Sequence, residues 1–158
     1  MTTQIDENLE YLSKERFEEL QKKLVELKTT RRIEIAQRLE YAKSLGDLSE
    51  NAEYAEAKEE QMINEAEVMK LEDLLSRAQL ISNKTSEFVQ VGSTVFARRA
   101  GAHKEQFMIV GKEEADPLKG KISHESPLGR SFLGKKKNEK FNVSTPKGQI
   151  EYQIIGIA

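Results

Sequence analysis

The sequence predicts an α+β protein in which a long antiparallel α-helical coiled-coil hairpin precedes a small mixed domain. Three observations predict this fold class. Apolar residues recur at coiled-coil spacing through the first half, a glycine interrupts that pattern near its middle, and β-branched, partly alternating segments fill the second half. We expect the coiled-coil domain at residues 1–81, a linker at 82–87 and the C-terminal domain at 88–158.

The first expected helix begins at a capping signal. Ser13 suits an N-cap, and Leu12 and Phe17 stand at the positions of a hydrophobic staple. The apolar seam runs through Phe17, Leu20, Leu24 and Leu27 and resumes, one position out of phase, at Ile35, Leu39 and Ala42. Arg31 stands where the next seam residue is due, which predicts a stutter there. Gly46 suits the position just after the helix.

A second helical pattern runs from about Leu48 to Leu80. Its expected seam has two phases, first Ala55, Met62, Ala66 and Met69, then Leu71, Leu74, Ala78 and Ile81. Two helices of about 30 residues joined by a short connection run antiparallel, each roughly 45 Å long. Residues 46–51 would then form a tip, far from where the chain enters and leaves the hairpin.

Strand-like segments follow at residues 89–97, 106–111 and 148–157. Pro146 and Gly148 predict a tight turn before the last of them. Between the strands, "ISHESPLGRSFLGKKK" predicts irregular structure with one short helix. The second half therefore reads as a small α+β domain with one modest core.

Composition excludes several kinds of protein. Without cysteine, a disulfide framework, a thiolate metal site and a cysteine nucleophile are excluded. The start of the chain lacks the pattern of a signal peptide, and no apolar run approaches the roughly 20 residues that span a bilayer. We expect a cytoplasmic protein with no membrane partner. His103 and His124 have no metal or catalytic set in the pattern and are expected as ordinary surface or loop residues.

Charge divides the chain into two halves. Residues 1–80 carry 19 acids against 12 bases, whereas residues 81–158 carry 8 against 13. This asymmetry predicts two units with different partners, the second partner being anionic. An acidic half is equally typical of a solvated helical face, so that alternative stays open.

The acidic tip has two interpretations. Asp47 and Glu50 are spaced as in a capping box, and the helix dipole favours carboxylates in a first turn; local sequence favours this reading. Alternatively, two carboxylates on one face could complete a Mg²⁺ site whose other ligands come from a partner. The window Asp47–Glu67 holds eight acids and one base, so an inserted arm would need basic walls or metal ions around it.

The stretch "GDLSENAEYAEAKEEQ" (46–61) resembles the signature of bacterial Gre transcript cleavage factors, GreA-like members in particular. The similarity covers nearly the whole chain. Its further blocks are "YLSKERFEELQKKLVELKTTRRIEI", "IVGKEEAD", "ISHESPLGRSFLGKKKNE" and "VSTPKGQIEYQII". One departure is Ile33, where the family often has proline; because isoleucine keeps its N–H, we expect a straighter helix there.

The resemblance implies a transcription elongation factor. Its coiled coil would enter the secondary channel of RNA polymerase and stimulate the polymerase's own cleavage of the 3′ end of backtracked nascent RNA, rescuing arrested complexes. Asp47 and Glu50 map onto the catalytic acids, which share a Mg²⁺ ion with the polymerase active site and position water. Asn51, Glu53 and Tyr54 match positions that we assign to support of the tip. The isolated protein would bind no cofactor and would not itself be an enzyme.

The resemblance also implies a docking domain. The C-terminal domain is similar to the FKBP fold and would dock on the coiled coil of the polymerase β′ subunit through Glu125, Ser126 and Pro127. Those residues alone favour an ordinary Ser-Pro turn. The helix also carries four basic residues that could contact RNA or channel phosphates: Arg31, Arg32, Arg38 and Lys43. A salt-bridged face with Glu34 and Glu40 is at least as compatible with the pattern.

Two other functions compete with cleavage. A channel-binding inhibitor would only plug the channel and would not need both acids. An FKBP-like prolyl isomerase or chaperone would need an apolar, aromatic-lined pocket, and the second half has few aromatic residues. We expect a monomer when free, because the two helical seams pair with each other.

Overall fold

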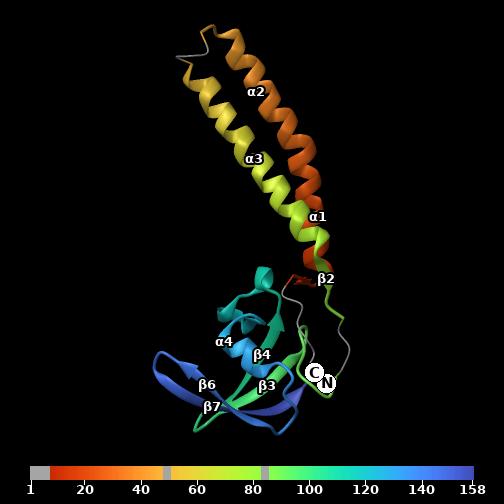
Figure 1. The fold of residues 1–158 in the computed structure, drawn as a ribbon, viewed down its shortest axis with the longest axis vertical. Helices are drawn as coiled ribbons and strands as arrows, with labels where there is room; N and C mark the ends of the chain where they lie inside the picture. Colours follow the sequence, from red (N-terminus) through yellow and green to blue (C-terminus); the bar gives the residue numbers. More distant parts are fainter. Residues whose placement is uncertain (1–7, 48–50, 83–85) are drawn as a thin grey trace. The chain divides into compact units, whose positions relative to one another are not determined.

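The computed structural model describes residues 8–47, 51–82 and 86–158, which form two compact units (Figure 1). One unit runs from Phe17 to Arg77; the other joins the described residues up to Arg16 with those from Ala78 onward. A long helical hairpin and a sheet-containing domain confirm the predicted α+β class. The domain limits at residues 81 and 88 stay a prediction.

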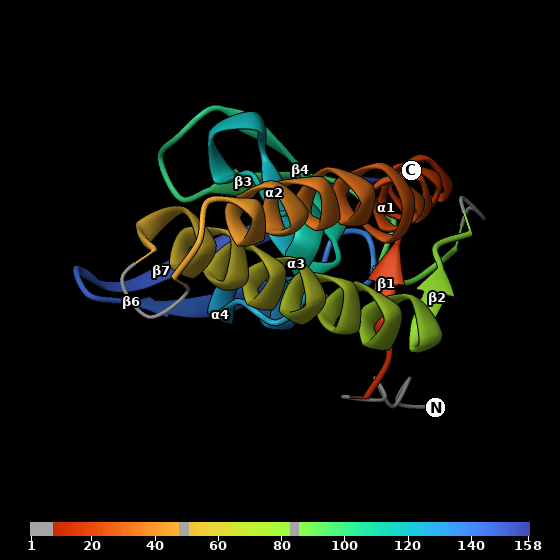
Figure 2. The same ribbon diagram turned by 90° about the horizontal axis from the view of Figure 1, so that it is seen from above.

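The hairpin consists of one uninterrupted helix and its antiparallel return. α1 (Lys14–Glu26), the π-helical segment η1 (Leu27–Arg31) and α2 (Arg32–Ser44) follow without a break, and α3 (Ala52–Ser76) lies alongside α2 (Figures 1 and 2). A π turn holds an extra residue, so it shifts the helix face by one position. The stutter predicted near Arg31 is this π turn, which ends two residues before Ile33.

The apolar face of the first helix lies where the spacing predicts it. Leu20, Ile35 and Ala42 are buried, one of them before η1 and two after it. Both seams therefore belong to the same buried face, although they differ in phase. The extra residue of η1 keeps them aligned.

The predicted seam of α3 is half wrong. Leu71 and Leu74 are buried as expected, but Met62 and Met69 are 71% and 70% exposed. The buried row consists of Ala57, Asn64, Val68, Leu71 and Leu74. The buried face includes a small residue, Ala57, and a polar one, Asn64. A prediction from hydrophobicity alone therefore chose the exposed face, which carries the two methionines. The helix also ends at Ser76, so Ala78 lies in a strand and not in the seam.

A five-stranded sheet organises the other unit. Its order is β5 (Lys121–Ser123), β4 (Lys104–Val110), β3 (Thr94–Arg99), β7 (Gly148–Ile157) and β6 (Lys140–Thr145). All neighbours are antiparallel except β4 and β5. The predicted segments overlap β3, β4 and β7, whereas β5 and β6 were missed. The predicted turn joins β6 to β7, where Thr145 pairs with Gly148 at φ +116°.

The core of the sheet unit gathers its aromatic residues around the predicted short helix, α4 (Pro127–Phe132). Phe132 is fully buried, with the rings of Phe107, Phe141 and Tyr152 at centroid distances of 5.4, 5.1 and 5.9 Å. Burial raises the pKa of the Tyr152 hydroxyl. His124 lies in the turn after β5, as the loop alternative expected, but it is not at the surface: it is 4% exposed and packs edge-on against Tyr11.

A short parallel pair adds the N-terminal segment to this unit. β1 (Glu10–Leu12) pairs with β2 (Ala78–Leu80). Strands of three residues are too short to be predicted from a sequence pattern. Tyr11 passes so close to Gly111 that a Cβ there would lie 1.8 Å from the Tyr11 carbonyl oxygen. Next to it, Lys112 pairs with the buried Glu10 at 2.8 Å, and this hydrogen bond raises the pKa of Lys112.

The predicted cap of the first helix is confirmed. Ser13 Oγ accepts a hydrogen bond from the Arg16 N–H at 3.1 Å. Among the residues described, no helix combines the length and apolarity needed to cross a bilayer.

Candidate functional site at the hairpin tip

The tip begins where α2 ends at Ser44. The Leu45 and Gly46 N–H groups close the last turn on the carbonyls of Ala42 and Lys43, at 3.2 and 3.4 Å. Gly46 has φ +114°, a left-handed conformation that glycine adopts without strain. Its predicted position just after the helix favours this conformation. Asp47 follows and is exposed, whereas its expected partner Glu50 lies outside the described residues.

Asn51, and not Asp47, caps the returning helix. Asn51 Oδ1 accepts from the Tyr54 N–H at 3.1 Å, and α3 begins at the next residue. The interpretation of Asp47 as the cap is therefore wrong, because Asp47 precedes the actual cap by four residues. Asparagine satisfies the first turn as well as aspartate does, and its amide also carries donors.

The NH2 group of the Asn51 side chain links the two helices. Asn51 Nδ2 donates to the Ala42 carbonyl at 2.6 Å, across the loop that contains Asp47. One side chain thus bonds the last turn of α2 and the first turn of α3. The sequence suggested only a supporting role for Asn51; an asparagine directly before a helical pattern is the signal for the cap, but nothing local predicts the bond to Ala42.

The basic residues of the first helix pair mostly with acids of α3. Arg38 contacts Glu60 at 2.5 Å and Glu53 and Glu56 at 3.6 Å each, and the hydrogen bond to Glu60 raises the pKa of Arg38. Arg31 lies 3.1 Å from Glu34.

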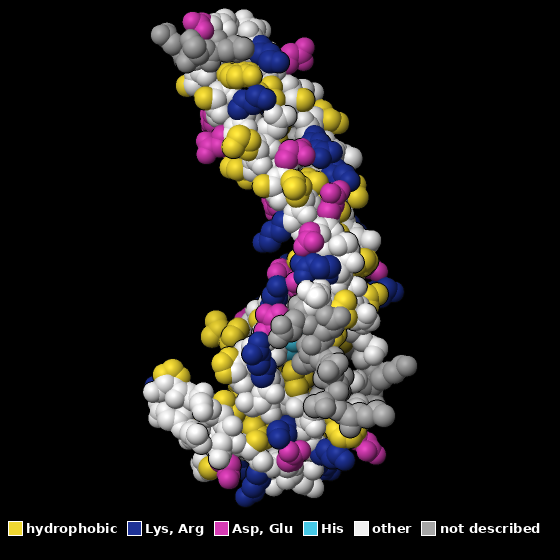
Figure 3. Space-filling view, in the orientation of Figure 1, with side chains coloured by type: hydrophobic (Ala, Val, Ile, Leu, Met, Phe, Trp, Pro, Cys, Tyr) yellow, Lys and Arg dark blue, Asp and Glu magenta, His cyan; other side chains and the backbone are white. Residues whose placement is uncertain are grey.

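Two further basic residues differ from each other. Arg32 forms two hydrogen bonds to Glu65, at 2.8 and 2.7 Å, whereas Lys43 is exposed and makes no ion pair within the described part of the chain. Acidic and basic side chains alternate along the hairpin on the face seen in Figure 3. The geometry therefore favours the salt-bridged alternative for the three arginines and leaves Lys43 as the basic residue near the tip.

The described residues do not form a metal site by themselves. No group of three or more His, Asp or Glu side chains among them is arranged to hold an ion. Asp47 offers carboxylate oxygens, the donor type that Mg²⁺ prefers, but Mg²⁺ requires six ligands in near-octahedral geometry. Among the described tip residues, Asp47 could supply one part of such a ligand set, and further ligands would have to complete it.

The candidate docking loop precedes α4. Ser126 Oγ accepts from the Gly129 N–H at 3.0 Å and donates to the Ser123 carbonyl at 2.7 Å, and Pro127 is the first helical residue. The Ser-Pro turn is thus also the N-cap of α4, while Glu125 is exposed.

A hollow of about 370 Å³ lies beside this loop. Its apolar lining is supplied by Ala115, Pro117, Ile122, Pro127, Leu128, Val143 and Pro146. None of its lining residues is aromatic, whereas the rings of Phe107, Phe132, Phe141 and Tyr152 lie in or against the core.

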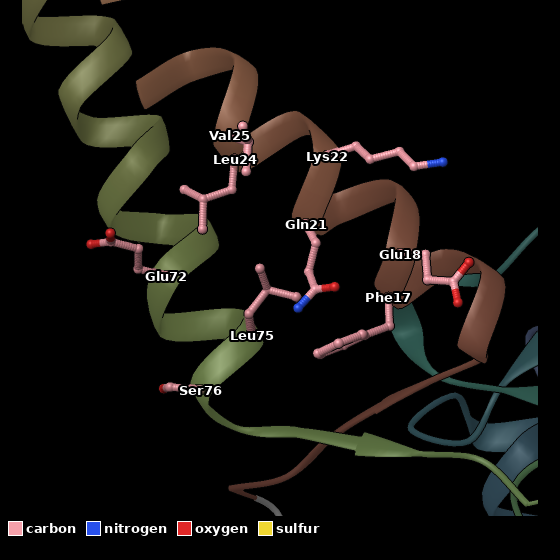
Figure 4. A pocket seen from close by; sticks show the side chains of 9 residues that line it. All are labelled: Phe17, Glu18, Gln21, Lys22, Leu24, Val25, Glu72, Leu75 and Ser76. Carbon is pink, nitrogen blue, oxygen red and sulfur yellow. The ribbon is translucent and has the colours of Figure 1, made fainter. Parts of the chain in front are cut away.

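An open groove of about 830 Å³ separates α1 from α3 at the end of the hairpin away from the tip. Phe17, Gln21 and Leu75 point into it (Figure 4). The sequence placed Phe17 and Leu24 in a closed seam, whereas both are only half-buried. The helices are therefore less tightly paired here than along α2.

Comparison with known proteins gives the family. Residues 10–80 match the family described as "Transcription elongation factor, N-terminal", and residues 84–158 match "Transcription elongation factor, GreA/GreB, C-term". The chain belongs to the GreA/GreB family of transcription elongation factors. This confirms the resemblance drawn from the tip motif and the blocks that follow it.

Similar GreA/GreB proteins cover almost the whole chain. Transcription elongation factor GreA of Thermosipho africanus is 43% identical over 148 residues, which are 93% of this chain and 95% of that protein. GreA of Bacillus subtilis is 43% identical over 143 residues, covering 89% and 91%. Among solved structures, GreA factor homolog 1 (Gfh1) of Thermus thermophilus is 28% identical, with 95% and 99% covered and a TM-score of 0.43.

Proposed function

We propose that this GreA/GreB protein binds RNA polymerase, inserts its hairpin into the secondary channel and stimulates the polymerase's cleavage of backtracked RNA. The observation that carries the proposal is the exposed Asp47, held in a loop that Asn51 closes at the end of two long helices. α2 has 13 residues and α3 has 25, so the loop lies roughly 20 Å or more along the pair. Such an arm suits delivery of a carboxylate into a narrow active site.

In this proposal the chain supplies ligands and position, and the polymerase supplies the rest of the active site. Asp47 and Glu50 would hold a Mg²⁺ ion together with polymerase groups. When bound, such an ion lowers the pKa of its water and stabilises charge on the phosphate. Because Asn51 caps α3, the Asp47 carboxylate is not used for that cap. The chain needs no catalytic set of its own.

The same proposal assigns docking to the second unit. Glu125, Ser126 and Pro127 would contact the β′ coiled coil at the channel mouth, where the cap by Ser126 fixes the loop backbone. Lys43 would meet RNA or channel phosphates near the tip. Prolyl isomerisation is disfavoured because the apolar hollow beside the loop has no aromatic lining.

Cleavage in a stalled, backtracked elongation complex tests the proposal. Wild type is compared with Asp47→Asn and Glu50→Gln, with Glu59→Gln, an exposed acid of α3, as the matched control. We expect both tip variants to lose stimulation while keeping helicity and polymerase binding, and the control to behave as wild type. Full cleavage by both tip variants would overturn the mechanism, and binding without any stimulation by wild type would indicate a channel-plugging inhibitor.

A further inference from the structure

The π-helical segment η1 faces a buried asparagine. Asn64 is 4% exposed and lies in the inner row of α3, between Ala57 and Val68. Its Nδ2 donates to the Leu27 carbonyl, in η1, at 3.2 Å. Its Oδ1 is buried without a hydrogen-bond partner among the described residues. A buried polar side chain whose hydrogen bonds are incomplete costs stability, so packing alone does not account for Asn64.

Charged pairs join η1 and its neighbour to α3 in the same region. Lys28, within η1, contacts Glu72 at 2.7 Å. Arg32, the first residue after η1, forms two hydrogen bonds to Glu65, the neighbour of Asn64. The π turn is thus attached to α3 through the Leu27 carbonyl, through the side chain of Lys28 within it and through that of Arg32 next to it.

We propose that Asn64 is a positioning residue: its bond to the π turn sets the register of α2 against α3 and thereby the place of Asp47. Apolar seams can pair in registers one turn apart at similar cost, whereas an amide in the seam needs an acceptor at one place. A π turn interrupts the regular ladder of helix hydrogen bonds, and here the carbonyl of Leu27 accepts from the facing amide. A buried asparagine that specifies register at a cost in stability is a known behaviour of coiled coils.

The tip depends on this register. Asn51 meets the Ala42 carbonyl at one end of the α2 and α3 pair, and Asn64 meets the Leu27 carbonyl near the other. A slip by one turn would move Ala42 about 5.4 Å along the helix axis, which exceeds the length of any hydrogen bond. The loop that contains Asp47 would then be open. The link to cleavage rests on the proposed function, but the register itself does not.

The test uses Asn64→Leu, with Glu59→Leu as a matched control on the exposed face of α3. The chain has no cysteine, so spin labels can be attached at Gln37→Cys and Lys58→Cys, both exposed, and their separation measured by electron–electron resonance. We expect one narrow distribution of label-to-label distances in the chain that keeps Asn64 and in the control. In Asn64→Leu we expect a second distance or a broadened distribution. The leucine variant removes the buried unpaired Oδ1 but also the donor to the Leu27 carbonyl. These two effects oppose each other, so we expect only a small change in melting temperature.

Cleavage is measured on the same chains without labels. We expect Asn64→Leu to reduce stimulation on the order of tenfold with polymerase binding unchanged, since misplacing a reacting group by about 1 Å can cost about 100-fold. An unchanged label separation in Asn64→Leu overturns the register role, whatever its melting temperature. If the wild type fails to stimulate cleavage, the proposed function fails, while the label separations still decide the role of Asn64.

Discussion

Glu114 binds the start of the hairpin's first helix through both of its carboxylate oxygens. Oε2 accepts from the backbone N–H of Ser13 at 2.8 Å, and Oε1 accepts from its hydroxyl at 2.7 Å. Ser13 Oγ in turn accepts from the Arg16 N–H. Residues 101 positions apart therefore complete one N-cap, in which the carboxylate orients the serine and adds negative charge at the helix N-terminus.

We predict that Glu114→Ala destabilises the protein by about 1–3 kcal/mol, because the Ser13 N–H and hydroxyl lose a half-buried charged partner. Chemical denaturation followed by circular dichroism measures the change. Glu113→Ala, the adjacent half-buried acid, is the control and should cost clearly less. Equal losses for the two variants would contradict a specific role for the Glu114 bonds.

Asn51→Asp should distinguish the contributions of the two hydrogen bonds that the Asn51 side chain makes. Aspartate can still accept from the Tyr54 N–H, but it has no donor for the Ala42 carbonyl. Its second carboxylate oxygen would then face that carbonyl oxygen, and two acceptors repel each other. We expect α3 to stay helical, the tip loop to open, and cleavage stimulation to fall about as far as in Asn51→Ala. Amide hydrogen exchange at Tyr54 and around Ala42 reports the two ends separately. Wild-type cleavage by Asn51→Asp would show that the Ala42 bond is dispensable.

Gly111→Ala should be among the most damaging small substitutions. The added Cβ would lie 1.8 Å from the Tyr11 carbonyl oxygen, so β1 would have to move; we expect a loss of about 3 kcal/mol or more. Gly156→Ala is the control, since its Cβ would meet only Phe96 at an ordinary 3.6 Å. Thermal unfolding of both variants measures the difference, and similar melting temperatures would refute the close approach of β1.

The Arg32–Glu65 pair should make the hairpin sensitive to acid. Its hydrogen bond lowers the pKa of Glu65 below the ordinary 4.5. A depressed folded-state pKa means that the contribution is complete above about pH 4.5 and is lost as pH falls through the lower folded value. Glu65→Gln should therefore lower the melting temperature less at pH 3 than at pH 7. A loss independent of pH would contradict this linkage.

Much of the fold follows from local pattern. The cap at Ser13, the break at Gly46 and the phase step near Arg31 all depend on residues close together in the chain, and each is present. β5, with three residues, and β6 were missed because their local sequences do not mark them as strands; each is a strand through the neighbour with which it pairs. The end of the first helix just before Gly46 follows from the same local signals, but the cap of α3 was assigned four residues too early.

The sequence by itself determined the helical hairpin, the break between its two helices and the family, because helix periodicity, glycine and motif order are local properties. Only the tertiary structure decided which face of α3 is buried, that Asn51 bonds Ala42, and that His124 and Glu10 lie inside. The physical reason is that burial depends on what a side chain meets. Asn64 lies inside, where its amide donates to the Leu27 carbonyl of η1, and Met62 lies outside although it is the more hydrophobic residue.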